Sequence, residues 1–162
     1  MDTKQLALRL VEKLRSRHLL VTTVESCTGG LLAGAITSVS GSSEIFEQGF
    51  VTYSNAAKTA LVGVPEDLLQ AHGAVSREVA AAMAEGGLKT AGASLALSVT
   101  GIAGPTGGSA DKPVGMVCFG LCQAGAEPQS QIMQFGDIGR DRVRENSVAH
   151  ALQWAIDTLY SF

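Results

Sequence analysis

Residues 19–30, with the sequence LLVTTVESCTGG, decide the predicted fold. Residues 19–24 are apolar or β-branched and predict a short buried strand. Residues 25–30 then turn the chain through two adjacent glycines, and residues 31–39 have the apolar pattern of a helix. A strand that leads through such a turn into a helix is typical of α/β sheets, whose ligands bind beyond the carboxyl ends of the strands.

The same patterns continue along the chain on both sides of this stretch. We expect helices at 3–17, 31–39, 56–62, from 65 for a short turn, from 77 to about 91, and at 140–160. We expect strands at 19–24, 46–53, 94–100, 114–123 and 129–135, and helix caps at Asp2 or Thr3, at Ser54 or Asn55, and at Ser76. This order predicts one domain, residues 1–162, with three α/β/α layers and a mixed, mostly parallel sheet.

The composition argues against several classes of partner. The net charge is −3 and only 5% of the residues are aromatic. A nucleic-acid-binding domain has a basic stripe, and a single-strand binder also stacks bases on aromatic side chains. No apolar run reaches the roughly 18 residues that a membrane-spanning helix needs. We therefore expect neither nucleic acid nor a membrane as a partner.

The cysteines indicate a reduced, cytoplasmic protein. There are three of them, and Cys118 and Cys122 lie in one predicted strand. Four residues of strand separate their Cα atoms by about 13 Å, whereas a disulfide needs about 7 Å or less. The N-terminal residues lack the pattern of a signal peptide, so we expect none. No cysteine or histidine cluster has zinc spacing, and we expect neither a metal nor a cofactor.

Ser26 is the first candidate for a catalytic residue. It follows a predicted strand and precedes a helix, whose free N–H groups favour an anionic ligand or a tetrahedral oxyanion. Ser26 is therefore either a nucleophile or, like Thr28, a residue that caps the helix. Cys27 is a rival nucleophile, although a small packing residue is the simpler interpretation. Glu25 either orients a catalytic group or makes a turn contact.

Lys58 is the candidate base for Ser26. With Asn55 as the cap, Lys58 is the third helical residue, where a cation opposes the helix dipole. Partial burial there would lower the pKa of its amine toward that of a useful base. Tyr53, at the end of the preceding strand, can pass or share the proton. The alternative places Lys58 in solvent and Tyr53 in the core.

The histidines are weaker candidates for a base than Lys58. His18 ends a helix, His72 lies in a turn beside Gly73, and His150 lies on the last helix. None of them falls in a loop that is expected at a catalytic edge, so surface or capping roles are favoured for all of them.

A second glycine-rich loop follows the strand at 94–100. Residues 101–112 have no Walker pattern, but they offer backbone donors beside a strand end, which suits a phosphorylated or ribosyl ligand. Arg140, Arg142 and Arg144 open the last helix, and Arg140 and Arg144 share a face. Arginine binds phosphate through its forked donors, although a solvated helix face is the alternative.

Taken together, these segments resemble the CinA C-terminal family, the nicotinamide mononucleotide deamidases of the PncC type. The resemblance covers nearly the whole chain in order. The matching blocks are Glu25–Gly30, Gly49–Asn55 with Lys58, His72–Ser76, Thr100–Pro105 with Gly107 and Gly108, Lys112–Gly115, Arg140–Arg144, and Ala151 with Leu152. One departure is Gly139, which stands before Arg140 where relatives often have Asp.

The resemblance implies a five-stranded sheet, a homodimer or larger assembly, and a serine amidohydrolase without a metal. Its reaction would convert nicotinamide mononucleotide to nicotinate mononucleotide and ammonia in pyridine-nucleotide salvage. The catalytic residues of the family fall on Ser26, Tyr53 and Lys58. The residues that we expect to bind substrate are Thr28, Gly29, Gly30, Asn55, Thr100, Gly101, Gly104, Arg140 and Arg144.

Other interpretations of the same residues remain open. A catalytically inactive paralogue that binds a nucleotide would share the glycine loops with an active enzyme. A hydrolase or transferase built on Cys27 would share the turn. A structural adaptor is disfavoured, because polar glycine loops are poor packing surfaces.

Overall fold

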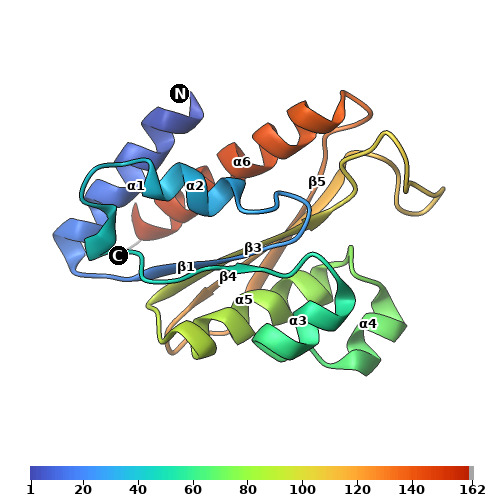
Figure 1. Cartoon of the computed structure of the whole chain (residues 1–162), viewed down its shortest axis with the longest axis horizontal. Coiled ribbons are helices and arrows are strands. Elements are labelled where there is room, and N and C mark those ends of the chain that lie inside the picture. The colour runs from blue at the N-terminus through green and yellow to red at the C-terminus, as the bar shows by residue number, and fades with distance from the viewer. Residues whose placement is uncertain (161–162) are drawn as a thin grey trace.

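The computed structural model describes residues 1–160, and these form three layers (Figure 1). Within them, five strands make one sheet in the order β2-β1-β3-β4-β5. The strands are β1 (Val21–Glu25), β2 (Phe50–Val51), β3 (Leu95–Gly101), β4 (Met116–Gln123) and β5 (Gln129–Gln134). The predicted α/β class and mixed five-stranded sheet are confirmed, while residues 161–162 of the predicted domain lie outside the described residues.

Helices cover both faces of the sheet (Figure 1). One face is covered by α1 (Thr3–Arg17), α2 (Leu31–Thr37) and α6 (Arg140–Tyr160). The other is covered by α3 (Asn55–Val62), α4 (Glu66–His72) and α5 (Arg77–Ala91). A short 3-10 turn, η1 (Ser42–Glu44), follows α2. The larger core lies under α1, α2 and α6, where residues such as Leu10, Leu97 and Leu152 are fully buried.

The sheet is mixed, with one strand reversed relative to the others. β1 pairs parallel with β2 and with β3, whereas β3 with β4 and β4 with β5 pair antiparallel. Because both antiparallel pairings involve β4, the other four strands of this sheet run in one direction, and the expected mixed, mostly parallel sheet is confirmed for residues 1–160. The reversal of β4 arises because β4 and β5 follow β3 as a meander, without a crossover helix between them.

The structure changes two local expectations for the segment that precedes Lys58. The predicted strand at 46–53 shrinks to Phe50–Val51, because only these residues pair with Val24 and Glu25. Of the two residues expected at the cap of α3, Ser54 and not Asn55 is the cap, since the Ser54 side chain accepts the hydrogen bond from the Ala57 N–H. Lys58 is therefore the fourth residue of the helix. The caps at Asp2 and Ser76 are confirmed.

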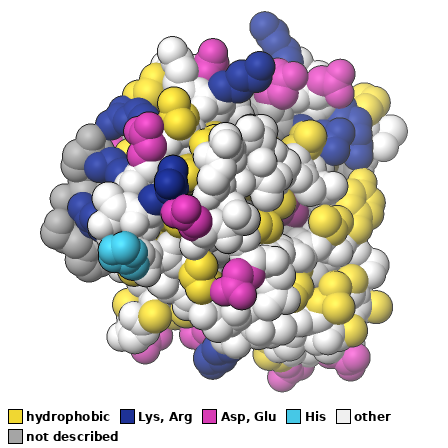
Figure 2. All heavy atoms as spheres, turned by 60° about the vertical axis from the view of Figure 1, so that its left-hand side comes forward, with side chains coloured by type: hydrophobic (Ala, Val, Ile, Leu, Met, Phe, Trp, Pro, Cys, Tyr) yellow, Lys and Arg dark blue, Asp and Glu magenta, His cyan; other side chains and the backbone are white. Residues whose placement is uncertain are grey.

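The surface mixes charges of both signs. On the face seen in Figure 2, Lys and Arg side chains alternate with Asp and Glu, and hydrophobic atoms lie between them. Among residues 1–160, no helix combines the length and the apolar character that crossing a membrane requires.

Glycine allows α3 to approach α5 closely. A Cβ on Gly86 of α5 would lie 1.8 Å from the carbonyl oxygen of Val62, the last residue of α3. This contact is with backbone, which cannot turn aside as a flexible side chain does. The position of α3, and with it that of Lys58, therefore depends on the missing side chain at Gly86.

We predict that Gly86→Ala lowers the free energy of unfolding by about 2 kcal/mol, the usual range for overpacking. Gly34→Ala is the matched control, because Gly34 lies in α2 and a methyl group added there would meet no atom within 4 Å. Its substitution should raise stability by about 0.5–1 kcal/mol through helix propensity. Urea unfolding of both variants provides the measurement. Equal effects in the two variants would contradict the close approach of α3 to α5.

Candidate functional site

Two neighbouring strand ends bring the candidate residues together. β1 ends at Glu25 and β3 at Gly101, and both strands run in the same direction. The Ser26 N–H donates to the Val99 carbonyl at 2.9 Å and so extends this ladder. Ser26 is therefore fixed at the carboxyl edge of the sheet, beside Thr100, where ligands of such sheets bind.

Lys58 reaches this edge from the neighbouring helix. The Thr52 N–H donates to the Glu25 carbonyl at 2.7 Å, and α3 then starts three residues later. Lys58 lies one turn into α3 on its buried side, four residues before the buried Val62. Its side chain is only 1% exposed. Lys58 is thus buried, as the first of the two sequence-based alternatives expected.

The Lys58 amine and the Ser26 hydroxyl are in hydrogen-bonding contact. The distance from Lys58 Nζ to Ser26 Oγ is 3.1 Å. The amine also donates to the Thr52 carbonyl at 2.9 Å. Within residues 1–160, no carboxylate forms an ion pair with Lys58. Loss of water around the amine therefore lowers the pKa of Lys58 from its ordinary value. Of the two causes that we expected, burial and the helix dipole, desolvation by burial is the main one.

These residues share one pocket of about 240 Å³. Of the predicted site residues, Ser26, Tyr53, Asn55, Lys58, Thr100, Gly101 and Arg140 line it. Cys27, Ala74, Val75 and Ala103, which we did not assign to a ligand site, also line it. The loop at Ala74 and Val75 lies in the block His72–Ser76 that carried part of the resemblance, and this was the available signal.

Tyr53 and Arg140 contact each other at the pocket. The Tyr53 hydroxyl accepts a hydrogen bond from Arg140 Nη2 at 3.1 Å, and the side chain of Tyr53 is 62% exposed. Arg140 Nη1 donates to the Gly104 carbonyl at 3.0 Å. The geometry therefore directs the Tyr53 hydroxyl to Arg140 rather than to the Ser26–Lys58 pair. A share of Tyr53 in proton transfer stays a prediction.

Arg144 of α6 donates hydrogen bonds to the turn that contains Ser26. Its Nε donates to the Cys27 carbonyl at 3.1 Å and its Nη2 to the Thr28 carbonyl at 3.4 Å. Gly29 lies close to the same guanidinium and has a positive φ of 56°. Two donors of Arg144 are thus engaged with backbone, and its predicted role in binding substrate stays a prediction.

Glu25 occupies the helix end that we expected to bind an anion. Its carboxylate is fully buried and accepts from the N–H groups of Leu32 and Ala33, at 2.8 and 3.0 Å. The Thr28 hydroxyl donates to it at 2.6 Å. The first turn of α2 therefore holds an internal carboxylate. Sequence reasoning missed this role, because the partners lie seven and eight residues away with no local motif.

The remaining donors of the turn are few. The Gly29 N–H donates to the Ser26 carbonyl at 3.0 Å, so it is not free for a ligand. Within the part of the chain that is described, the N–H groups of Cys27 and Thr28 donate to no other residue. Gly30, at the start of α2, and Gly104 lie outside the set of pocket-lining residues, and their roles also stay predictions.

The Cys27 thiol is a poor nucleophile in this setting. The residue is 6% exposed, and burial raises the pKa of Cys27 to about 12. A reactive cysteine needs a lowered pKa, since the thiolate is the attacking species. All cysteines among the described residues are free thiols.

The histidines do not line this pocket. His18 caps α1, and His72 ends α4 with its ring 3.7 Å from the Glu78 carboxylate. His150 packs against Phe119 and hydrogen-bonds Gln131. The described residues also contain no group of His, Cys, Asp or Glu side chains that could hold a metal ion.

Comparison with known proteins shows the family of this chain. The model of the CinA C-terminal domain matches residues 3–159. The chain belongs to the CinA C-terminal domain family. A structure of the competence/damage inducible protein CihA from Agrobacterium tumefaciens superposes with a TM-score of 0.94 at 45% identity, covering 97% of this chain and 95% of that one. A CinA superfamily protein from Klebsiella pneumoniae gives 0.95 at 33% identity, with both chains fully covered.

Curated relatives in this family differ in length. The nicotinamide-nucleotide amidohydrolase PncC of Escherichia coli is 51% identical over 94% of this chain, which covers 92% of that protein. A putative competence-damage inducible protein of Symbiobacterium thermophilum is 52% identical over 86% of this chain. The matched region spans only 34% of that longer relative.

We predict that the burial of Lys58 makes stability depend on pH. The pKa of Lys58 is lower in the folded chain than its ordinary value of 10.5, so the unfolded chain binds more protons between the two values. The free energy of unfolding should therefore rise with pH through this window, by at most about 1.4 kcal/mol per pH unit. Lys58→Met should remove this rise. Urea unfolding at neutral pH and near the ordinary lysine pKa measures it.

The control for this prediction is Lys89→Met, because the side chain of Lys89 is 75% exposed. That variant should keep the pH dependence of the wild type. If Lys58→Met and the wild type change in parallel with pH, the amine of Lys58 is not desolvated in solution.

Proposed function

We propose that this chain hydrolyses the carboxamide of nicotinamide mononucleotide to nicotinate mononucleotide and ammonia. The observation that carries the proposal is the 3.1 Å contact between the Ser26 hydroxyl and a buried lysine amine. The name of the Escherichia coli relative, which this chain matches over nearly its full length, supports the choice of substrate. The product would retain its ribosyl phosphate, which suits pyridine-nucleotide salvage.

Lys58 acts as the base that activates Ser26. A neutral amine can donate one hydrogen to the Thr52 carbonyl and still direct its lone pair at the Ser26 hydroxyl. Desolvation favours this neutral form, which is the form that can accept a proton. Lys58 takes the hydroxyl proton while Ser26 Oγ forms a bond to the carboxamide carbon.

The tetrahedral oxyanion needs hydrogen-bond donors. Because the Glu25 carboxylate accepts hydrogen bonds from the Leu32 and Ala33 N–H groups, the first turn of α2 does not supply these donors. The Cys27 N–H is the better candidate, since it follows the nucleophile directly, lines the pocket with its residue and has no protein acceptor among residues 1–160.

Lys58 then returns the proton to the leaving group. The protonated amine donates to the carboxamide nitrogen, the carbon–nitrogen bond breaks and ammonia leaves. Water attacks the resulting ester at the same carbon, and Lys58 accepts a proton from that water. Cleavage of the ester then restores the Ser26 hydroxyl with the proton held by Lys58. One base thus serves both half-reactions.

Arg140 is the candidate partner for the substrate phosphate. Among the described residues it is the arginine that lines the pocket, and it opens α6, where a helix dipole also favours an anion. Its present hydrogen bonds are to a neutral hydroxyl and a carbonyl, Tyr53 and Gly104. A phosphate would be a stronger acceptor for the guanidinium than either of them.

We predict that Ser26→Ala lowers ammonia release from nicotinamide mononucleotide about a thousandfold or more, because it removes the nucleophile. Lys58→Arg should cause a comparable loss, since a guanidinium stays protonated. The double variant should be little worse than either single variant, because the two residues act as a unit. A coupled ammonia assay on purified protein measures all of them.

Ser42→Ala is the matched control for the loss of a serine hydroxyl. Ser42 is also buried, at 7% exposure, but lies in η1 outside the pocket. Its substitution should leave turnover near the wild-type rate. Turnover that survives Ser26→Ala but not Cys27→Ala would identify a cysteine hydrolase instead. Binding of the nucleotide by wild-type protein without any ammonia release would identify an inactive paralogue.

A further inference from the structure

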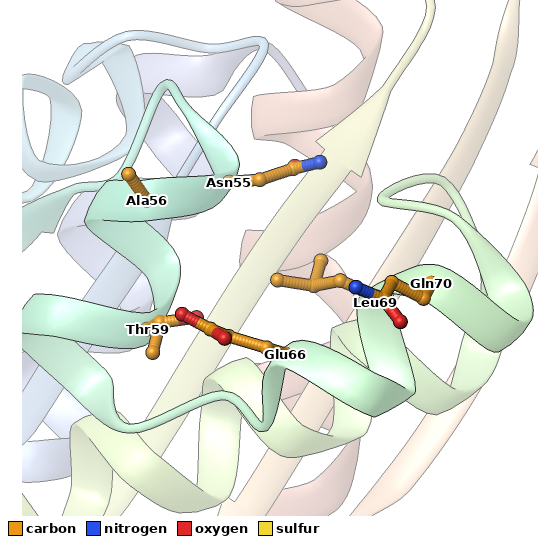
Figure 3. Close-up of a pocket in the computed structure, with 6 residues that line it drawn as sticks. All are labelled: Asn55, Ala56, Thr59, Glu66, Leu69 and Gln70. Atoms are coloured by element: carbon orange, nitrogen blue, oxygen red, sulfur yellow. The ribbon is translucent and has the colours of Figure 1, made fainter.

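A second cavity adjoins the catalytic pocket. It measures about 390 Å³ and lies between α3 and α4 (Figure 3). The residues that line it are Asn55, Ala56, Thr59, Glu66, Leu69 and Gln70. Asn55 also lines the pocket of Ser26 and Lys58, so the two spaces meet at the start of α3. We call this second space the α3–α4 cavity.

Size suggests that a substrate extends into this cavity. Pockets for small molecules usually measure about 300–1,000 Å³. The catalytic pocket, at about 240 Å³, lies below that range. It has room for the reacting carboxamide and its ring, but the rest of a nucleotide needs further space. The α3–α4 cavity offers that space next to the reacting atoms.

The side chains that line the α3–α4 cavity indicate what kind of group it can bind. No Lys, Arg or His of the described residues lines the cavity, so it is not suited to a phosphate. Figure 3 shows the Glu66 carboxylate reaching toward Thr59 and the Asn55 amide extending into the same space above Leu69. Thr59 donates its hydroxyl hydrogen to the Val64 carbonyl, which leaves its oxygen as an acceptor. This lining is suited to hydroxyl donors.

Three polar side chains of the lining have no hydrogen-bonding partner in the described part of the chain. Within residues 1–160, the side chains of Asn55, Glu66 and Gln70 make no hydrogen bond or ion pair. A carboxylate is the group that commonly accepts from a ribose hydroxyl in dinucleotide-binding folds. The side chain of Leu69, which is 8% exposed, supplies an apolar floor for the carbon face of a sugar ring.

The spacing along α3 matches the structure of a nicotinamide nucleotide. Asn55, Lys58 and Thr59 are at positions i, i+3 and i+4 and so share one side of the helix. The pyridinium ring of such a nucleotide separates its carboxamide from its ribose. With the carboxamide at Ser26, the ribose lies about one ring width away, which is comparable to the roughly 5.4 Å of one helical turn.

We propose that the α3–α4 cavity binds the ribose hydroxyls of the substrate and that Glu66 is their principal acceptor. This assignment, which rests on the proposed function, makes Glu66 a specificity-determining residue that favours ribosylated nicotinamide over free nicotinamide. The phosphate stays outside the cavity, toward Arg140.

A structural explanation for Glu66 can be tested separately. Glu66 and Asp67 are both in the first turn of α4, where a negative charge stabilises a helix. Both are exposed, but only Glu66 lines the cavity. Asp67→Asn is therefore a matched control for Glu66→Gln, because each variant removes one carboxylate from the same helix turn.

The experiment measures binding in the Ser26→Ala background by calorimetry, with nicotinamide mononucleotide and its 2′,3′-dideoxyribosyl analogue as probes. Glu66→Gln should weaken binding of the nucleotide about tenfold, as expected for loss of a charged hydrogen-bond acceptor. It should leave binding of the analogue unchanged, and Asp67→Asn should change neither. With Ser26 intact, Glu66→Gln should raise KM and preserve kcat.

An equal loss for both probes, no loss for the nucleotide, or the same loss in Asp67→Asn would overturn the assignment. Normal ammonia release with an unchanged KM in Glu66→Gln would also overturn it while leaving the proposed function intact. Binding that depends on Glu66, in a protein that releases no ammonia, would retain the cavity and refute the hydrolysis.

Discussion

The site depends on keeping one lysine amine away from water. A buried, unpaired charge is costly, so the chain stabilises the neutral form of Lys58 instead of pairing it with a carboxylate. The Thr52 carbonyl and the Ser26 hydroxyl satisfy the amine without adding a negative charge. Both partners are held by main-chain bonds to the sheet, through Thr52 to Glu25 and through Ser26 to Val99. The reactive contact is therefore positioned by main-chain hydrogen bonds to β1 and β3.

The topology also separates the buried carboxylate of Glu25 from the buried amine of Lys58. Glu25 points to the face covered by α2, while Lys58 comes from α3 on the opposite face (Figure 1). Had the carboxylate faced the amine, it would have raised the pKa of Lys58 and held it in the protonated form. Glu25 instead accepts hydrogen bonds from N–H groups in the first turn of α2, where the helix dipole favours a carboxylate. Alternation of side chains along β1 thus protects the base.

Local sequence signals predicted the elements and only part of the site. Helix periodicity and the caps at Asp2 and Ser76 are properties of neighbouring residues, and they were confirmed. The length of β2 depends on its pairing with β1, which no local pattern encodes. The burial of Lys58 was one of two alternatives, and Val62, one turn further on the same side of α3, is the sequence signal that favours it. The meander of β4 and β5 was visible in the order of elements, and it explains why the sheet is mixed.

The contacts that complete the site join residues distant in the sequence. Arg144 reaches the carbonyls of the Ser26 turn from α6, and a backbone carbonyl, that of Thr52, anchors the lysine. Side-chain identity alone does not reveal either contact. Helix α3 contributes to both spaces, because it presents Lys58 to the catalytic pocket, Thr59 to the α3–α4 cavity and Asn55 to both. A rigid helix keeps these positions in a fixed relation, so the close approach at Gly86 aligns the base and the proposed sugar site together.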